Sequence, residues 1–122
     1  MVDAILTKIR SELTKLGYTV HATRQEKLAY NALVVVIEDV EIEVETSTSY
    51  ICSSYVLVEW DTTNGDNIPN QIVTMISSLE NIVVHSGVSL APTFTFVTCE
   101  VNPLGLLYRV SLTIRYKEVI NL

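Results

Sequence analysis

The side chains with the clearest chemical potential form a row of glutamates in the sequence VEIEVE. Glu41, Glu43 and Glu45 alternate there with apolar residues. In a β-strand, alternate residues share one face and lie about 7 Å apart. Carboxylates paired in this way can perform acid–base catalysis or bind a hard cation where a pocket shifts their pKa values. A regular row on a strand predicts solvated acids instead, so we expect neither catalysis nor a metal site here.

Short motifs of common catalytic sites are missing from the sequence, including GxSxG, the P-loop, GxGxxG, HExxH and the EF-hand loop. His21 and His85 are far apart and lack the spacing of metal ligands, which also argues against a Ser-His-Asp triad. Cys52 and Cys99 lie in strand-like apolar surroundings and form no CxxC. We expect two reduced core thiols, with a disulfide or a metal pair as the alternative. The sequence therefore predicts no enzyme, no cofactor and no metal.

The length of 122 residues suits one α+β domain spanning residues 1–122. Apolar residues make up 48% of the chain, enough for a core without disulfides or metal. No run of 18 apolar residues exists, so we expect no membrane span. The N-terminal stretch has charges at helical spacing and lacks the apolar stretch and cleavage site of a signal peptide. Synthesis in the cytoplasm is therefore the expectation.

Charge is distributed unevenly along the chain. The formal net charge is −6, but residues 28–108 hold ten acidic side chains and no lysine or arginine. The segments before and after this stretch are each +2. Phosphate binding needs cations, so the middle of the chain does not favour a surface that grips nucleic acid. It is compatible with a surface that DNA passes without sticking.

The first half of the chain predicts a helix followed by a long β region. Apolar residues at spacings of three and four indicate an amphipathic helix: Val2, Ile5, Leu6, Ile9, Leu13 and Leu16. Asp3 suits the start of this helix and Gly17 its end. A short extended piece follows at 18–23, and a loop or a loose turn at 24–31. The Val-rich segment 32–46 and the segment 49–60 predict strands, joined either by a turn at 38–39 or, as we favour, near 46–49.

The second half predicts a second helix and two more strands. The sequence NGD marks a loop, after which Asn67 is a candidate N-cap and Pro69 fits a first turn. A wide apolar face on 68–82 indicates a helix. Residues 93–101 and 106–119 predict strands around an NPLG turn. The element order predicts an α+β fold, with an antiparallel or mixed sheet, two helices packed on one face and a long β-hairpin.

Two charged stripes are the candidate functional residues. One is acidic and the other basic, and the set comprises Glu41, Glu43, Glu45, Glu59, Arg109, Arg115 and Lys117. The stripes can be two solvated sheet faces, or cross-strand ion pairs worth under about 1 kcal/mol each. They can also be complementary patches between neighbouring subunits of a closed ring. In a further alternative, the acidic hairpin lines the hole of that ring and repels the DNA backbone.

Several segments together resemble a known protein family. They are the amphipathic N-terminal helix ending at Gly17, the Val-rich strand with its long polar-faced continuation, the helix after NGDNIP, and the last strand LYRVSLTIRYKEV. In length and element order they resemble the tail terminator proteins of long-tailed bacteriophages, the group that includes the tail terminator of phage lambda. The resemblance covers most of the chain and does not depend on a short motif.

The resemblance implies a structural role. Members of that family are small α+β proteins that form homo-hexameric rings, cap the finished tail tube, stop its polymerisation and join the tail to the head. It implies a virion protein assembled in the host cytoplasm, without enzymatic activity, whose partners are itself, the tail-tube protein and a head–tail connector or head-completion protein. DNA would pass an acidic lumen without specific binding. The alternatives are another neck, head-completion or tail-tube-like subunit, or a small cytoplasmic enzyme or ligand-binding domain.

Overall fold

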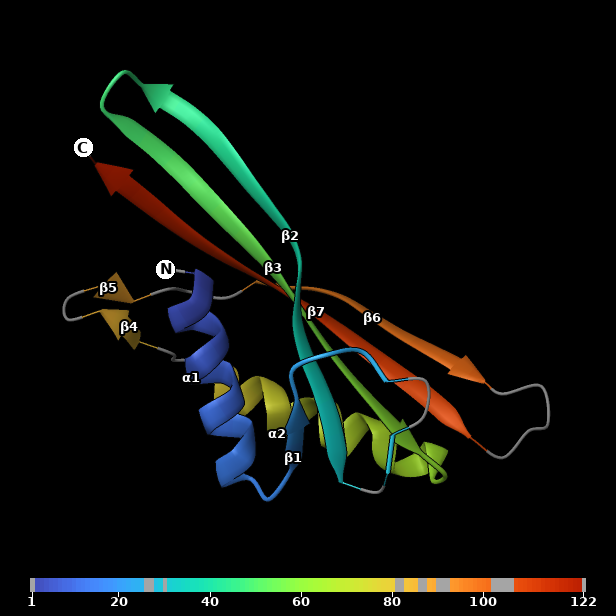
Figure 1. The fold of residues 1–122 in the computed structure, drawn as a ribbon. Coiled ribbons are helices and arrows are strands. Elements are labelled where there is room, and N and C mark those ends of the chain that lie inside the picture. The colour runs from blue at the N-terminus through green and yellow to red at the C-terminus, as the bar shows by residue number, and fades with distance from the viewer. Residues whose placement is uncertain are drawn as a thin grey trace.

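The computed structural model describes residues 2–25, 28–29, 31–80, 83–85, 88–89, 93–101 and 107–121. Its elements, shown in Figure 1, are α1 (Val2–Lys15), β1 (Thr19–His21), β2 (Ala32–Thr46), β3 (Ser49–Thr62), the 3₁₀-helix η1 (Gly65–Asn67), α2 (Ile68–Leu79), β4 (Val83–His85), β5 (Val88–Ser89), β6 (Thr93–Val101) and β7 (Tyr108–Asn121).

Five of the strands form one mixed sheet in the order β1-β2-β3-β7-β6, and β4 pairs with β5 separately. Only β1 and β2 run parallel to each other, whereas the remaining neighbours in the sheet are antiparallel. β2 and β3 form a long hairpin that turns between Thr46 and Ser49. The predicted α+β class and the favoured position of the hairpin turn are confirmed. The predicted NPLG turn lies outside the described residues.

The helix α1 follows from its sequence. Ile5, Ile9 and Leu13 recur at every fourth position and are fully buried, which contributes about 1.5–3 kcal/mol for each side chain. Gly17 ends the helix with a φ of +96°, a conformation that glycine adopts without steric cost. Its N–H donates to the Thr14 carbonyl and the Tyr18 N–H donates to the Leu13 carbonyl, the pattern of a Schellman cap.

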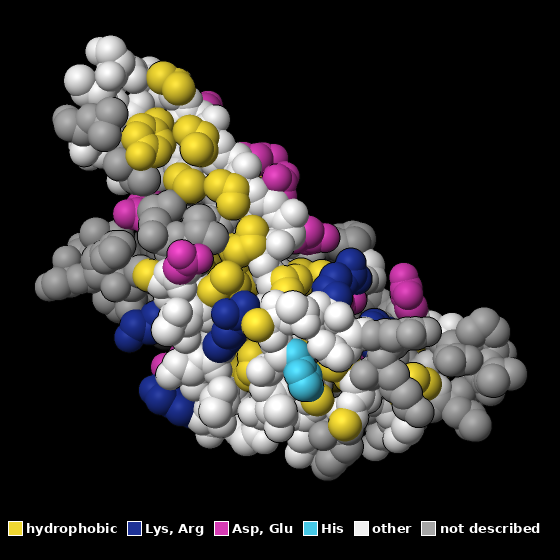
Figure 2. All heavy atoms as spheres, in the orientation of Figure 1, with side chains coloured by type: hydrophobic (Ala, Val, Ile, Leu, Met, Phe, Trp, Pro, Cys, Tyr) yellow, Lys and Arg dark blue, Asp and Glu magenta, His cyan; other side chains and the backbone are white. Residues whose placement is uncertain are grey.

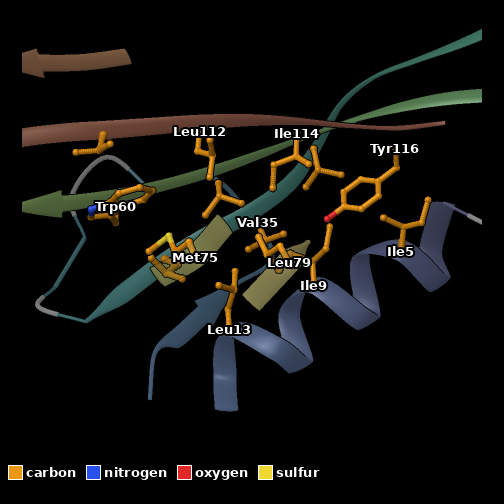
Figure 3. Close-up of a cluster of buried hydrophobic side chains, with 14 residues drawn as sticks. Ile5, Ile9, Leu13, Val35, Trp60, Met75, Leu79, Leu112, Ile114 and Tyr116 are labelled. Carbon is orange, nitrogen blue, oxygen red and sulfur yellow. The ribbon is translucent and has the colours of Figure 1, made fainter. Parts of the chain in front are cut away.

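One face of the sheet carries the main hydrophobic core (Figure 3). Ile5, Ile9 and Leu13 of α1 and Met75 and Leu79 of α2 pack against side chains that alternate along the strands. The buried strand residues of this cluster are Leu33, Val35, Val56, Val58, Trp60, Val110, Leu112, Ile114 and Tyr116. Both helices therefore lie on the same face, as predicted, and we call it the helix face.

The start of α2 differs from the prediction in one detail. Asn67 occupies the N-cap position, but its backbone is already helical and its side chain makes no capping hydrogen bond. Asn64, one turn earlier, caps η1 instead, because its side-chain oxygen accepts a hydrogen bond of 3.1 Å from the Asp66 N–H. Near the start of α2, Gln71 accepts a hydrogen bond of 3.0 Å from Trp60 Nε1. This bond ties α2 to β3.

The two cysteines were expected to be reduced and buried in the core. Both are free, and Cys52 is buried as expected. Cys99 is exposed, so that part of the prediction is wrong. The reason is topological, because β6 is the last strand of the sheet and Cys99 lies near its outer edge.

Figure 1 shows that the sheet extends well beyond the helices. The strands cross near the middle of the view because the sheet is strongly twisted. Below the crossing, the strands lie against α1 and α2. Above it, the end of β2, the start of β3 and the end of β7 project away from both helices. This projection contains most of the residues that the sequence singles out.

Candidate functional site

Three strand segments form the projection, which we call the ribbon: residues 39–46 of β2, 49–55 of β3 and 115–121 of β7. β3 is the central strand and pairs with β2 on one side and with β7 on the other. β1 pairs only with residues 32–34 of β2, and β6 pairs only with residues 108–115 of β7. The ribbon segments of β2 and β7 are therefore the two edges of the ribbon.

A β-bulge at Glu38 decides which way the ribbon side chains point. Ile37 pairs with Val56 and Asp39 pairs with Tyr55, so Glu38 has no partner of its own on β3. Side chains alternate between faces with a period of two, and one extra residue therefore exchanges the faces. Beyond the bulge, Val40, Ile42 and Val44 lie on the helix face, whereas Asp39, Glu41 and Glu43 lie on the opposite face. Glu45 continues the acidic row at a second irregularity, between Val44 and Thr46, where it has no partner on β3.

The acidic row on that opposite face makes few contacts within the chain. Glu41 Oε2 accepts a hydrogen bond of 3.1 Å from the Tyr55 hydroxyl. Glu45 Oε2 accepts one of 3.0 Å from Ser49 Oγ. Within the described part of the chain, neither they nor Glu43 take part in an ion pair. Partial burial and the hydrogen bond to Glu41 raise the pKa of Tyr55, so its hydroxyl stays protonated and continues to donate.

The basic residues of β7 share this face with the acids. Arg115 donates from Nε and Nη2 to Ser53 Oγ at 3.3 and 3.1 Å, and its guanidinium lies 5.8 Å from the centre of the Tyr55 ring. These contacts hold Arg115 within its own protomer. Lys117, one step further along the same face, is exposed and forms no ion pair with any described residue. On this face, the two edges of the ribbon thus carry opposite charges, whereas Glu118 of β7 lies on the helix face.

The helix face of the ribbon is apolar and open. Val40, Ile42 and Val44 are 40%, 64% and 75% exposed, although their neighbours in β3 are partly or fully buried. Figure 2 shows hydrophobic side chains in a line along the ribbon, with acidic side chains along one edge. A line of exposed valine and isoleucine side chains is unusual on an isolated protein and is typical of an interaction surface.

Glu59 and Arg109 lie at the base of the sheet, away from the ribbon, in two internal ion pairs. Arg24 donates to both carboxylate oxygens of Glu59 at 2.9 and 3.1 Å, and the Glu59 side chain is 3% exposed. Arg109 donates to both oxygens of Asp61 at 2.6 and 2.8 Å, and the Asp61 side chain is 2% exposed. These two candidates are therefore engaged inside the protomer.

The two ion pairs fix three described residues of the predicted loop, Arg24, Gln25 and Leu28, against the sheet. Asp61 also accepts from the Leu28 N–H at 2.9 Å, and Arg109 donates to the Gln25 carbonyl at 2.9 Å. Burial alone would raise the pKa of Asp61, but the hydrogen bonds from Arg109 and Leu28 outweigh it and leave that pKa below its ordinary value. The same pair raises the pKa of Arg109. Buried Leu28 completes the attachment by packing against Ala32 and Val34.

The structure thus brings five of the seven predicted residues onto the ribbon and places the other two, Glu59 and Arg109, at the base of the sheet. Sequence analysis missed Tyr55 and Ser53, which bind Glu41 and Arg115 on the same face. The sequence reveals only part of this arrangement. Residues 32–37 are apolar at every position, and only from Val40 onward do apolar residues, at even numbers, alternate with acids. The face on which the acids lie therefore follows from the strand pairing and not from the sequence alone.

Other kinds of site find no support in the described residues. Within them, no group of three or more His, Cys, Asp or Glu side chains is arranged to hold a metal ion. The helices of this part of the chain are too short and too polar to cross a membrane. A cavity of about 400 Å³ lies beside Asp61 and is lined mainly by the amides and hydroxyls of the β3–α2 loop and α2. Among the described residues that line it, Asp61 has the only charged side chain, and this carboxylate is already bound to Arg109.

Comparisons with known proteins give one informative result. The chain is similar to a chain in the virion of a native gene transfer agent particle, with a TM-score of 0.57 and 14% sequence identity. The match covers 96% of this chain and 92% of that chain. At this identity, the comparison shows that the two chains share a fold. No family model matches the sequence, and no curated protein matches it.

Proposed function

We propose that this protein is a structural virion protein with the role of a tail terminator. Six copies form a ring that caps the tail tube, stops its polymerisation and joins the tail to the head. Its partners are further copies of itself, the tail-tube protein and a head–tail connector or head-completion protein. The ring assembles in the host cytoplasm and has no enzymatic activity. Residues 1–122 act as one domain in this assembly.

The observation that carries the proposal is the ribbon. It exposes an apolar line on one face, and on the other an acidic row that forms no ion pair with any described residue; both lie beyond the helices. Neither surface stabilises a monomer. In an assembly, the apolar line can be buried against a neighbouring subunit, and the acidic row can face the DNA. Two further facts support a virion role: the fold is shared with a virion chain of a gene transfer agent particle, and the element order resembles phage tail terminators.

The acidic row gives the proposed ring a way to pass DNA. Glu41 and Glu43 lie on the ribbon face opposite to the helix face, together with Asp39. Three carboxylates there outnumber the two cations, Arg115 and Lys117. A lumen lined by this face keeps a negative charge and repels the phosphate backbone, so duplex DNA passes without binding.

Two measurements test the proposal. Static light scattering of the purified protein, alone and with isolated tail tubes, should show a species of about 80 kDa, six chains of 13.6 kDa each. A protein that remains a monomer even with tail tubes contradicts the ring. Electron microscopy of particles made without the protein should show overlong tails. Normal tails beside heads that leak DNA would indicate head completion, which is the alternative role.

A further inference from the structure

The ribbon has two free strand edges. Arg10 Nη2 of α1 donates a hydrogen bond of 2.9 Å to the Val35 carbonyl, which satisfies β2 where β1 ends. From residue 39 to 46, no described strand pairs with the outer side of β2. No described strand pairs with the outer side of residues 117–121 of β7 either, because β6 ends its pairing at residue 115. Each edge therefore presents a row of backbone N–H and C=O groups that can pair with another strand.

The charges on the edges decide which pairs can form. Glu41 and Glu43 lie on the β2 edge, whereas exposed Lys117 lies on the β7 edge and on the same face of the ribbon. Two β2 edges repel each other, because their carboxylates meet. On this face, Lys117 of a β7 edge attracts the carboxylates of a β2 edge. Glu118, the next residue of β7, lies on the helix face, where β2 presents Val40, Ile42 and Val44. Opposite charges thus select contacts between unlike edges and reject contacts between like edges.

The geometry points to a second copy of this chain as the partner of each edge: the end of β7, residues 117–121, pairs with the β2 edge, residues 39–46, of the next subunit. This inference rests on the proposed ring and states how its subunits join. Because the two edges are different surfaces, the contact is heterologous and repeats from copy to copy. Lys117 of one subunit then lies beside Glu41 or Glu43 of the next.

The direction of the new strand pair follows from the sheet. β2 and β7 are both antiparallel to β3, so they run parallel to each other. When copies are related by rotation about an axis along the ribbon, β7 of one copy and β2 of the next also run parallel. The ribbons then form a continuous closed sheet, which removes both free edges. One face of this sheet faces the axis, and the acidic face is the one that the proposed function places there.

Charge reversal tests the contact. Lys117→Glu alone and Glu43→Lys alone each place like charges together, and the association constant should fall at least tenfold for each contact, so that both variants become monomers. The double variant on one chain restores attraction at each contact and should form the ring again. An equimolar mixture of the two single variants should do the same, in alternation. Lys8→Glu, an equal change at an exposed lysine of α1, should leave the ring intact.

Disulfide cross-linking tests the direction of the contact. Lys117→Cys combined in turn with Glu41→Cys, Glu43→Cys and Glu45→Cys, in a Cys99→Ser background, covers the neighbouring registers. The pair within about 7 Å between Cα atoms should cross-link on oxidation. A heterologous contact gives a ladder from dimer upward, ending at the ring. A product that stops at the dimer indicates a two-fold contact and overturns the inference.

The outcomes separate this inference from the proposed function. If the wild-type protein forms a ring and Lys117→Glu leaves it unchanged, the edge pairing is wrong while the terminator role stands. If both single variants are monomers and neither the double variant nor the mixture recovers the ring, the pairing is also wrong. If the wild-type protein does not assemble even on tail tubes, the proposed function fails, and the pairing fails with it. Circular dichroism of each variant verifies that the protomer is folded.

Discussion

The buried ion pair between Asp61 and Arg109 gives a quantitative prediction about stability. Asp61→Asn removes the negative charge but keeps the size and shape of the side chain. Arg109 then loses its counter-ion while it remains largely buried, with 22% of its side chain exposed. Leu28 and Gln25 lose part of their attachment as well, because both are hydrogen-bonded to this pair.

The structure sets the size of the effect. Removing one partner of a buried pair costs about 3–5 kcal/mol, and the partial exposure of Arg109 places this case near 3 kcal/mol. A domain of this length is stable by roughly 10 kcal/mol, so the variant should still fold. With a urea slope of about 2 kcal/mol per molar, the unfolding midpoint should fall by about 1.5 M.

Trp60 fluorescence provides the assay, since Trp60 is the only tryptophan and is buried in the core. Urea titrations should be made at a concentration where wild type and variant have the same oligomeric state. Glu12→Gln is the matched control, because it makes the same kind of change in the exposed pair with Lys15 and should cost under about 1 kcal/mol. Equal losses in the two variants would refute the reasoning.

The direction in which the effect of Asp61→Asn changes with pH can also be predicted. The folded-state pKa of Asp61 lies below its ordinary value of 3.8. Its contribution to stability is therefore complete above that ordinary value and is lost as the pH falls through the folded-state pKa. The difference in unfolding free energy between wild type and Asp61→Asn should be constant at neutral pH and should shrink in strong acid. A difference that grows on acidification would contradict the assignment.

Three further changes test other parts of the fold by the same urea titration. Gly17→Ala should cost about 1 kcal/mol, because alanine is strained at a φ of +96° although no atom lies within 4 Å of the added Cβ. Tyr116→Phe should leave the stability unchanged or raise it by up to about 1 kcal/mol, since the buried hydroxyl has no hydrogen-bond partner among the described residues; a clear loss would reveal a partner. Met75→Ala should cost about 2–5 kcal/mol by opening a cavity, whereas Val73→Ala, at a position of α2 that is 63% exposed, should cost under about 0.5 kcal/mol.

Much of the fold can be predicted from local patterns. The spacing of Ile5, Ile9 and Leu13 and the glycine at position 17 define α1, because both depend only on residues within a few positions of each other. The alternation in β7 likewise predicts which of its side chains are buried. Residues 46–49, with the sequence TSTS, contain no Gly or Pro. The sequence therefore allows the hairpin turn at two positions, and the structure confirms the later one.

The functional site could be predicted only in part, because its residues depend on pairing between distant strands. The sequence does not distinguish Glu59 and Arg109 from the other charged candidates. In the structure, Glu59 forms an ion pair with Arg24, and Arg109 forms one with Asp61. The free edges of the ribbon depend on which residues of β2 pair with β1 and which residues of β7 pair with β6. No local pattern reveals that pairing. The alternation from Val40 to Val44 does predict that the acids and the valines lie on opposite faces, but the bulge at Glu38, which decides which face each takes, follows only from the strand pairing.

The bulge at Glu38 also restricts how the hairpin can evolve. Loss or gain of a single codon between this position and the turn would place the carboxylates on the helix face and the valines on the opposite face. Changes of two codons would lengthen or shorten the hairpin while leaving each surface with its own chemistry. Homologous hairpins should therefore differ in length by even numbers of residues, unless they gain or lose an irregularity such as those at Glu38 and Glu45.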